Sequence, residues 1–144
     1  MNAPAPLRAE PRPTPETAPF WDHAAQGELW LPRCRDTGRF FFPPRAFSPF
    51  TGGPIDWEQA SGRATLASFL VVHQPAPGFA EEVPYVVALA RLEEGPHLMT
   101  NLPGAPADPQ VLRAAIGAPL ELTFEQRGDH ALPQFRLVDA GAAA

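Results

Sequence analysis

The fold is decided first in residues 33–53, which read RCRDTGRFFFPPRAFSPFTGG. Two short turns of the same layout, CRDTG and SPFTG, lie at its ends. In each turn, two side chains separated by two residues are followed by a glycine, Gly38 or Gly52, where a left-handed backbone is needed. This is the spacing of paired metal-binding knuckles, although the chain contains a single cysteine, Cys34. The sequence therefore predicts two knuckle turns and leaves open whether they hold an ion.

The knuckles lack the donors that zinc requires. A rubredoxin-like zinc ribbon holds its ion with four thiolates from two Cys-x-x-Cys turns. The corresponding positions here are Cys34, Thr37, Ser48 and Thr51. Hydroxyl groups are neutral, hard donors with little affinity for zinc at neutral pH, so we expect no zinc. Instead, the three hydroxyls should accept backbone N–H bonds that cysteine sulfurs would otherwise accept. Cys34 is interpreted as a leftover knuckle residue, since no histidine lies nearby in sequence.

Arginine and phenylalanine alternate through the same stretch, with Asp36 as its only carboxylate. The members are Arg33, Arg35, Arg39, Arg45, Phe40, Phe41, Phe42, Phe47 and Phe50. Guanidinium groups pair bidentately with phosphate while a ring stacks on a base, so the patch suits CoA, a protein partner or single-stranded nucleic acid. Alternatively, the arginines only cover exposed rings of a solvated hairpin. We select as CoA- or partner-binding residues Arg39, Phe41, Arg45, Arg33 and Phe47.

Toward the N-terminus, residues 1–15 alternate proline with alanine and charge, which predicts a disordered tail. Helical periodicity follows and ends near Gly27. Two short strands, 28–31 and 39–42, are then expected to form a hairpin. Residues 16–54 are therefore assigned to a helix plus a degenerate zinc-ribbon hairpin.

Toward the C-terminus, the sequence predicts five strands. They span about residues 55–74, 84–92, 96–102, 119–126 and 131–138. Between the third and fourth, a helix with a proline at its first position starts after Asp108 and stops at Gly117. A long first strand that bends at Gly62, together with this helical insert, favours a mainly β, partly open OB-fold barrel over a β-sandwich. Residues 55–139 are assigned to the OB-fold domain and 140–144 to a tail.

Composition narrows the function classes. The chain has 144 residues, 44% of them hydrophobic, which is enough for one domain with its own core. The net charge of −5 gives no global positive field for nucleic acid or an anionic membrane. Lysine is absent from the sequence, which excludes Schiff-base chemistry on lysine. A single cysteine, no signal-peptide core and apolar runs of only strand length predict a cytoplasmic protein that does not cross a membrane.

A second candidate site lies in the loop after the long first strand, where His73, Phe79 and Tyr85 flank the sequence PAPG. A histidine can donate to a thioester carbonyl, so these residues are assigned to an acyl or pantetheine path. The simpler interpretation of His73 is a surface hydrogen-bonding residue. The sequence shows no Gly-rich phosphate loop, no nucleophile motif and no metal-ligand spacing among its histidines. No catalytic residue and no metal site are therefore assigned.

The order and spacing of these motifs resemble one known family, the zinc-ribbon and OB-fold proteins catalogued as domain of unknown function thirty-five. The resemblance runs from about Phe20 to Val138. Its carriers are Phe20-Trp21, LPRC at 31–34, GRFFFPPR at 38–45, SGRAT at 61–65, PYVVA at 84–88 and LEEGP at 92–96. The loss of three knuckle cysteines departs from the family pattern and removes the ligands of its structural zinc.

The resemblance implies a non-catalytic accessory subunit of lipid metabolism. Such a subunit binds acyl-CoA or docks on a thiolase-like, hydroxymethylglutaryl-CoA synthase-like, aldolase or hydratase enzyme, with CoA or acyl-CoA as its ligand and no tightly bound cofactor. The alternative is an OB-fold protein that binds single-stranded nucleic acid, which the acidic second and third strands disfavour. A small independent thioesterase or hydratase is a third class, supported only by His73 and Cys34. Exposed aromatic side chains in the hairpin would also suit a homodimer.

Overall fold

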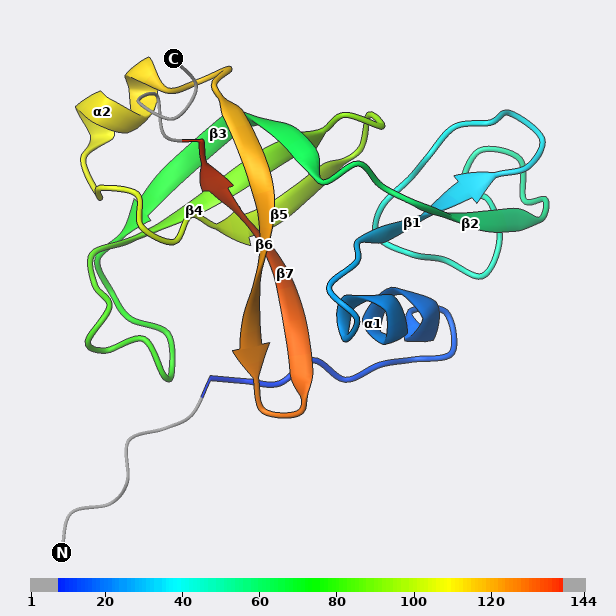
Figure 1. The fold of residues 1–144 in the computed structure, drawn as a ribbon, viewed down its shortest axis with the longest axis horizontal. Coiled ribbons are helices and arrows are strands. Elements are labelled where there is room, and N and C mark those ends of the chain that lie inside the picture. The colour runs from blue at the N-terminus through cyan, green and yellow to red at the C-terminus, as the bar shows by residue number, and fades with distance from the viewer. Residues whose placement is uncertain (1–7, 139–144) are drawn as a thin grey trace, which may run out of the picture.

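The computed structural model describes residues 8–138. Residues 1–7 and 139–144 lie outside the described residues, and with them part of the predicted N-terminal tail and all of the predicted C-terminal one. A two-stranded sheet and a five-stranded sheet occupy opposite ends of the molecule, with a short helix beside the chain that links them (Figure 1). Within residues 8–138, neither helix has the length and apolar character that a bilayer span requires.

The first helix, α1 (Ala18–Ala24), confirms the helical pattern seen in the sequence. Phe20 and Ala24 are four residues apart, so they share one face of the helix, and both are buried. This face packs on β1 and β7, one strand from each sheet. The chain reverses after α1 at Gly27, which has a φ of 78°. The helix therefore joins the two sheets through a shared core.

The two-stranded sheet pairs β1 (Trp30–Cys34) with β2 (Ile55–Gln59) in antiparallel register. This corrects the predicted hairpin between residues 28–31 and 39–42. The second of those segments contributes a single bridge, Phe40 to Arg33. Two prolines follow directly after residues 39–42 and have no N–H for a ladder, so the segment cannot continue as a strand.

The predicted long strand at 55–74 is in fact two strands in two sheets. β2 ends at Gln59, and β3 (Arg63–Val72) begins the larger sheet. Gly62 lies at the break with a φ of 82°, and a Cβ added there would stand 3.3 Å from the Cβ of Leu122. The prediction that Gly62 bends one continuous strand was therefore wrong: it separates β2 from β3.

The five-stranded sheet has the order β5-β4-β3-β6-β7, with every pairing antiparallel. Its other strands are β4 (Tyr85–Leu92), β5 (His97–Asn101), β6 (Pro119–Arg127) and β7 (His130–Leu137). Between β5 and β6 lies α2 (Pro109–Ala114), where the Asp108 side chain accepts a hydrogen bond of 2.9 Å from the backbone N–H of Gln110. The predicted capped helix and the OB-type order of strands are confirmed, and the β-sandwich alternative is excluded.

The barrel is not closed by backbone pairing, since β5 and β7 are the two edges of the sheet. Side chains join these edges instead. The Thr100 hydroxyl accepts a hydrogen bond of 3.0 Å from the backbone N–H of Phe135, and Gln134 Nε2 lies 3.4 Å from Asn101 Oδ1. The result is the partly open barrel that the sequence predicts.

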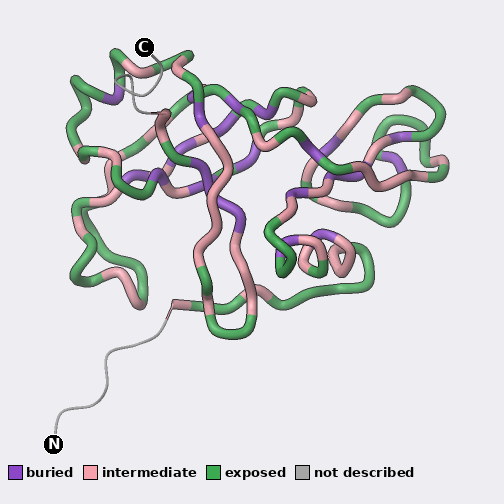
Figure 2. The backbone as a smooth tube through the Cα atoms, viewed as in Figure 1, coloured by how far each residue is buried: buried purple, intermediate pink, exposed green. Residues whose placement is uncertain are grey.

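The core follows the alternation expected of strands with one buried face. In β4, Val86, Ala88, Ala90 and Leu92 are buried while the residues between them are more exposed (Figure 2). Phe135 of β7 is fully buried, and α2 contributes Leu112 to the same cluster. Phe20 and Leu31 extend this cluster toward the smaller sheet. One continuous apolar core therefore fixes the position of the ribbon against the barrel.

Candidate functional site

The knuckle hydroxyls accept the backbone hydrogen bonds that the sequence assigns to them. Thr37 Oγ1 accepts from the N–H of Arg39 at 3.2 Å. Ser48 Oγ accepts from the N–H groups of Phe50 and Thr51 at 3.0 and 3.3 Å. Thr51 Oγ1 itself accepts from a backbone N–H two residues later, at 3.1 Å. The hypothesis that hydroxyls replace thiolates in holding these turns is confirmed.

This donor set does not fit zinc. Besides accepting a backbone bond, the Thr51 hydroxyl donates to Asp36 Oδ2 at 2.8 Å, so it is already engaged on two sides. Only Cys34 offers a thiol among the four positions. Within residues 8–138, no three His, Cys, Asp or Glu side chains are grouped so as to hold a metal ion. The ribbon therefore forms without the four thiolate ligands that usually hold this fold around zinc.

Cys34 is fully buried beneath the knuckles. Burial raises the pKa of its thiol, but hydrogen bonds from Ser48, Thr37 and Thr51 outweigh burial and lower the pKa from 9.0 to about 7. His73 is exposed on a loop that follows β3 in the other sheet. A buried thiol with no access to substrate is not a nucleophile, so the structure disfavours the small-thioesterase alternative.

The first pocket lies between the ribbon and the turn that joins β4 to β5, and its volume is about 720 Å³. Three of the selected residues, Arg39, Phe41 and Arg45, line it together. The opposite wall comes from the turn, through Glu94 and His97. The structure therefore brings the leading candidates for CoA or partner binding to a single cavity between the two sheets.

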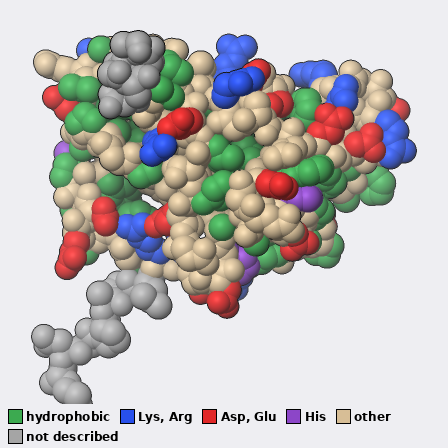
Figure 3. Space-filling view, in the orientation of Figure 1, with side chains coloured by type: hydrophobic (Ala, Val, Ile, Leu, Met, Phe, Trp, Pro, Cys, Tyr) green, Lys and Arg blue, Asp and Glu red, His purple; other side chains and the backbone are tan. Residues whose placement is uncertain are grey.

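The arginines at the start of the ribbon are more strongly paired than the sequence indicates. Arg33 forms an ion pair of 2.8 Å with Glu58, and its Nε donates to the carbonyl of Gly38 at 2.8 Å. Arg35 pairs with Asp56 at 2.8 Å. The expectation that Asp36 alone opposes this charge was wrong, because β2 carries two further carboxylates alongside β1. In Figure 3, arginines at the ribbon end accordingly lie beside carboxylates.

Among the remaining members of the patch, Arg39 is held over an aromatic ring. Its Cζ lies 4.0 Å from the centroid of Phe50, and Phe50 meets Phe41 edge to face at 6.2 Å. Phe47 is 65% exposed and does not line this pocket. Phe50 belongs to the patch but was not selected as a binding residue from the sequence, although its place in the second knuckle was an available signal.

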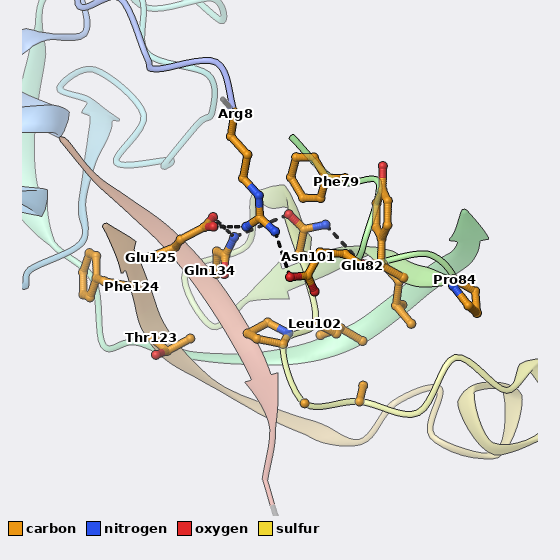
Figure 4. Close-up of a pocket in the computed structure, with 15 residues that line it drawn as sticks. Arg8, Phe79, Glu82, Pro84, Asn101, Leu102, Thr123, Phe124, Glu125 and Gln134 are labelled. Carbon is orange, nitrogen blue, oxygen red and sulfur yellow. Dashed lines mark hydrogen bonds and ion pairs between the residues drawn. The ribbon is translucent and has the colours of Figure 1, made fainter. Parts of the chain in front are cut away.

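The second pocket lies where the β3–β4 loop meets β6 and β7, and its volume is about 390 Å³. Phe79 and Tyr85 line it with their ring centroids 4.9 Å apart, whereas His73 is exposed and outside the lining. Glu125 and Arg8 also line it, and neither was selected from the sequence (Figure 4). The pocket therefore brings together two of the three residues assigned to the acyl path, Phe79 and Tyr85, and leaves out His73.

The outer face of the larger sheet bears on the nucleic-acid alternative. Cross-strand pairing places Leu70 beside Val87, and Leu89 beside Met99. Met99 is 73% exposed and Leu70 54%. OB-folds that bind single strands use stacking aromatic rings and a positive groove on this part of the barrel. Aliphatic side chains occupy its centre here, which disfavours that alternative.

Comparison with known proteins matches both parts of the chain. The family model "ChsH2, rubredoxin-like zinc ribbon domain" matches residues 21–47, and "ChsH2, C-terminal OB-fold domain" matches residues 57–125. A probable enoyl-CoA hydratase alpha subunit of Thermomonospora curvata is 36% identical over 92% of this chain and 41% of its own length. The 3-oxo-4,17-pregnadiene-20-carboxyl-CoA hydratase alpha subunit of Mycobacterium tuberculosis is 39% identical over 79% of this chain and 35% of its own. The chain thus spans about two fifths or less of these relatives.

Three further proteins contain chains of similar size to this one. A DUF35 domain-containing scaffold protein of Methanothermobacter thermautotrophicus is 31% identical, over 77% of this chain and 83% of its own. The solved structure titled "Ltp2-ChsH2(DUF35) aldolase" contains a chain that is 33% identical, with a TM-score of 0.76 over 89% of this chain and 98% of that one. A DUF35 structure from Sulfolobus solfataricus, 16% identical with a TM-score of 0.62, shares the fold.

Ribbon, helix and open barrel together define a ribbon-plus-OB-fold protein. The chain belongs to the DUF35 family, as these identities and coverages show.

Proposed function

We propose that this chain is a non-catalytic accessory subunit that docks on an enzyme of acyl-CoA metabolism of the thiolase-like, aldolase or hydratase type. The observation that carries the proposal is its likeness, over 98% of the neighbour, to a chain from a solved aldolase assembly. Relatives described as hydratase alpha subunits and as scaffold proteins support it from the sequence side. The burial of Cys34 and the exposure of His73 on a loop of the other sheet give no support to the alternative of an independent small thioesterase.

The first pocket is the proposed site for the nucleotide end of CoA. Its volume is within the range of small-molecule sites. Among the described residues, no carboxylate forms an ion pair with Arg39 or Arg45, so both guanidinium groups are available for phosphate. The exposed ring of Phe50 supplies an aromatic surface for the adenine base, and the buried ring of Phe41 packs against Phe50 from within. Acyl-CoA bound there would lie between ribbon and barrel, where both parts hold it.

Arg33 and Phe47 have a smaller role in this proposal. The guanidinium of Arg33 is engaged by Glu58 and Gly38 within the ribbon. Phe47 is exposed and outside the pocket lining, so it suits contact with a partner chain rather than with the ligand. The assignment of Phe79 and Tyr85 to an acyl or pantetheine path stays a prediction, because Arg8, Glu82 and Glu125 line the same pocket and suit a cationic group better than an acyl chain.

Co-purification tests the docking proposal directly. The chain would carry an affinity tag and be recovered from its native host at low salt, followed by mass spectrometry and native sizing. We expect a thiolase-like, aldolase or hydratase subunit in stoichiometric amount, reduced when the wash is repeated at high salt. A chain that elutes alone in both washes, at the size of a monomer or of the alternative homodimer, would contradict the proposal. Cytoplasmic localisation is a further prediction, which fractionation of the same host would check.

A further inference from the structure

Arg8 reaches the second pocket from outside the barrel, and every edge of its guanidinium group has a partner there (Figure 4). Nε donates to the carbonyl of Gly78 at 3.2 Å. Nη1 is paired with Glu125, and Nη2 lies 3.3 Å from Glu82. Cζ stands 3.9 Å from the centroid of the Phe79 ring. Two carboxylates, a carbonyl and an aromatic face are the complete set of groups that recognise a planar guanidinium.

The walls of this pocket are held in place by contacts other than those to Arg8. Glu125 also accepts from Arg127 Nη2 at 2.7 Å and from Gln134 Nε2 at 3.0 Å, and its side chain is only 21% exposed. The Phe79 ring packs on Tyr85 at 4.9 Å. Because β6, β7 and β4 anchor these partners, Glu125 and the Phe79–Tyr85 pair are held independently of the segment that carries Arg8.

Two glycines give the segment its close approach. A Cβ added at Gly78 would stand 2.6 Å from the backbone nitrogen of Arg8, and one added at Gly128 would meet the Glu10 carboxylate. Glu10 is also 3.4 Å from His130 Nδ1. Gly78 is in the β3–β4 loop and Gly128 is in the β6–β7 turn. Residues 8–10 therefore cross the tips of both connections.

The second pocket lies at the position where OB-folds usually bind their ligands. The two connections are the first and the last in the five-stranded barrel, and OB-folds bind their ligands between these two loops. Here the chain's own arginine occupies that position. Arg8 precedes α1 and takes no part in either sheet.

We propose that the pocket between the β3–β4 loop and β6–β7 is a binding site for arginine side chains, in which Arg8 is the chain's own competing ligand. The occupant that replaces Arg8 is an arginine presented by another polypeptide. Only the source of that arginine, a partner enzyme subunit, rests on the proposed function; the guanidinium specificity follows from the pocket itself. Release of residues 8–10 would accompany this exchange.

The test uses the full chain with Arg8→Ala and two tripeptides, acetyl-Ala-Arg-Ala-amide and its lysine counterpart. Binding is followed by NMR through shifts of the Phe79 and Tyr85 rings. The tethered Arg8 acts at an effective concentration of about 1 mM, so if one arginine binds the pocket with a Kd of about 0.1 mM, the variant should bind the arginine peptide about tenfold more tightly than the unaltered chain does. The lysine peptide should bind about tenfold more weakly, because an ammonium cannot span both carboxylates and stack on the ring.

Three controls separate this result from a general change in the fold. Arg12→Ala removes an arginine from the same segment and should leave peptide binding as in the unaltered chain. Arg8→Ala combined with Glu125→Gln should abolish binding of the arginine peptide. If that double variant unfolds, Arg8→Ala combined with Phe79→Leu keeps both carboxylates, removes the stacking ring and should weaken binding severalfold.

An Arg8→Ala chain that binds neither peptide, or both equally, would overturn the proposal. No partner enzyme is present in the experiment, so this failure would leave docking on an acyl-CoA enzyme intact. Conversely, a chain that is recovered from its host without a partner would contradict the docking proposal and leave the peptide result unaffected.

Discussion

The thiol of Cys34 lies 3.8 Å from the hydroxyl of Thr51, across from one knuckle to the other. A tetrahedral site with zinc–sulfur bonds of about 2.3 Å has ligand-to-ligand edges of about 3.8 Å. This pair of positions therefore keeps the spacing of a metal site in a ribbon whose donors do not fit a metal.

Restoring the thiols should restore the ion. The triple variant Thr37→Cys, Ser48→Cys, Thr51→Cys is expected to bind zinc at one ion per chain, whereas the unaltered chain should contain far less. Elemental analysis of both purified proteins measures this. The same three changes combined with Cys34→Ser provide the control and should bind zinc more weakly. Stoichiometric zinc in the unaltered chain, or none in the triple variant, would contradict the prediction.

The pH dependence of stability should reveal the state of Cys34. Because the folded pKa is lowered from 9.0 to about 7, the folded state favours the thiolate. The resulting stabilisation is fully present above the unfolded pKa and is lost as the pH falls through the folded one. The unaltered chain should therefore gain stability relative to Cys34→Ser as the pH rises from 7 to 9. Urea unfolding at several pH values tests this, and a constant difference between the two proteins would refute it.

CoA binding should depend on two arginines of the first pocket. Arg39→Ala with Arg45→Ala removes both phosphate-binding groups and leaves the buried core untouched, so the variant should fold normally. Its affinity for CoA should fall at least about tenfold, which is about 1.4 kcal/mol. Calorimetry measures the affinity, and Arg113→Ala, on α2 away from the pocket, is the matched control. Equal affinities in all three proteins would remove these arginines from the site.

Substitutions at two glycines, one between α1 and β1 and the other between β2 and β3, separate backbone strain from packing. Gly62 and Gly27 have nearly equal φ angles of 82° and 78°, but only at Gly62 does an added Cβ meet another side chain, that of Leu122. Replacing either with alanine should cost about 1–2 kcal/mol of unfolding free energy for the left-handed backbone. Gly62→Ala should cost more because of this contact. Urea unfolding of both variants decides it, and equal losses would mean that Leu122 moves aside freely.

Local signals explain which parts of this fold are predictable. The helix after Asp108 has its cap and its proline in adjacent positions, and β4 and β5 are joined by a turn that is visible in the sequence. The knuckle turns are equally local, since their glycines and hydroxyls stand within a few residues of each other. Each of these elements was predicted close to its observed bounds.

Features that depend on distant partners were missed. The pairing of β1 with β2 joins segments about twenty residues apart, and the mostly polar run from Glu58 to Arg63, where the chain changes sheet, was interpreted as a bend within one strand. The same error concealed the carboxylate partners of Arg33 and Arg35. Arg8 was assigned to a tail because its neighbours are prolines and alanines, whereas charge and stacking, not apolar burial, hold it in place.

The side-chain bonds between Thr100 and Phe135, and between Asn101 and Gln134, bear on how this protein behaves in a crowded solution. Exposed strand edges attract the edges of other molecules and lead to aggregation. Because β5 and β7 face each other and are joined across the gap, each edge is shielded by the other. The open barrel thereby gains the protection of a closed one without a complete ring of backbone hydrogen bonds.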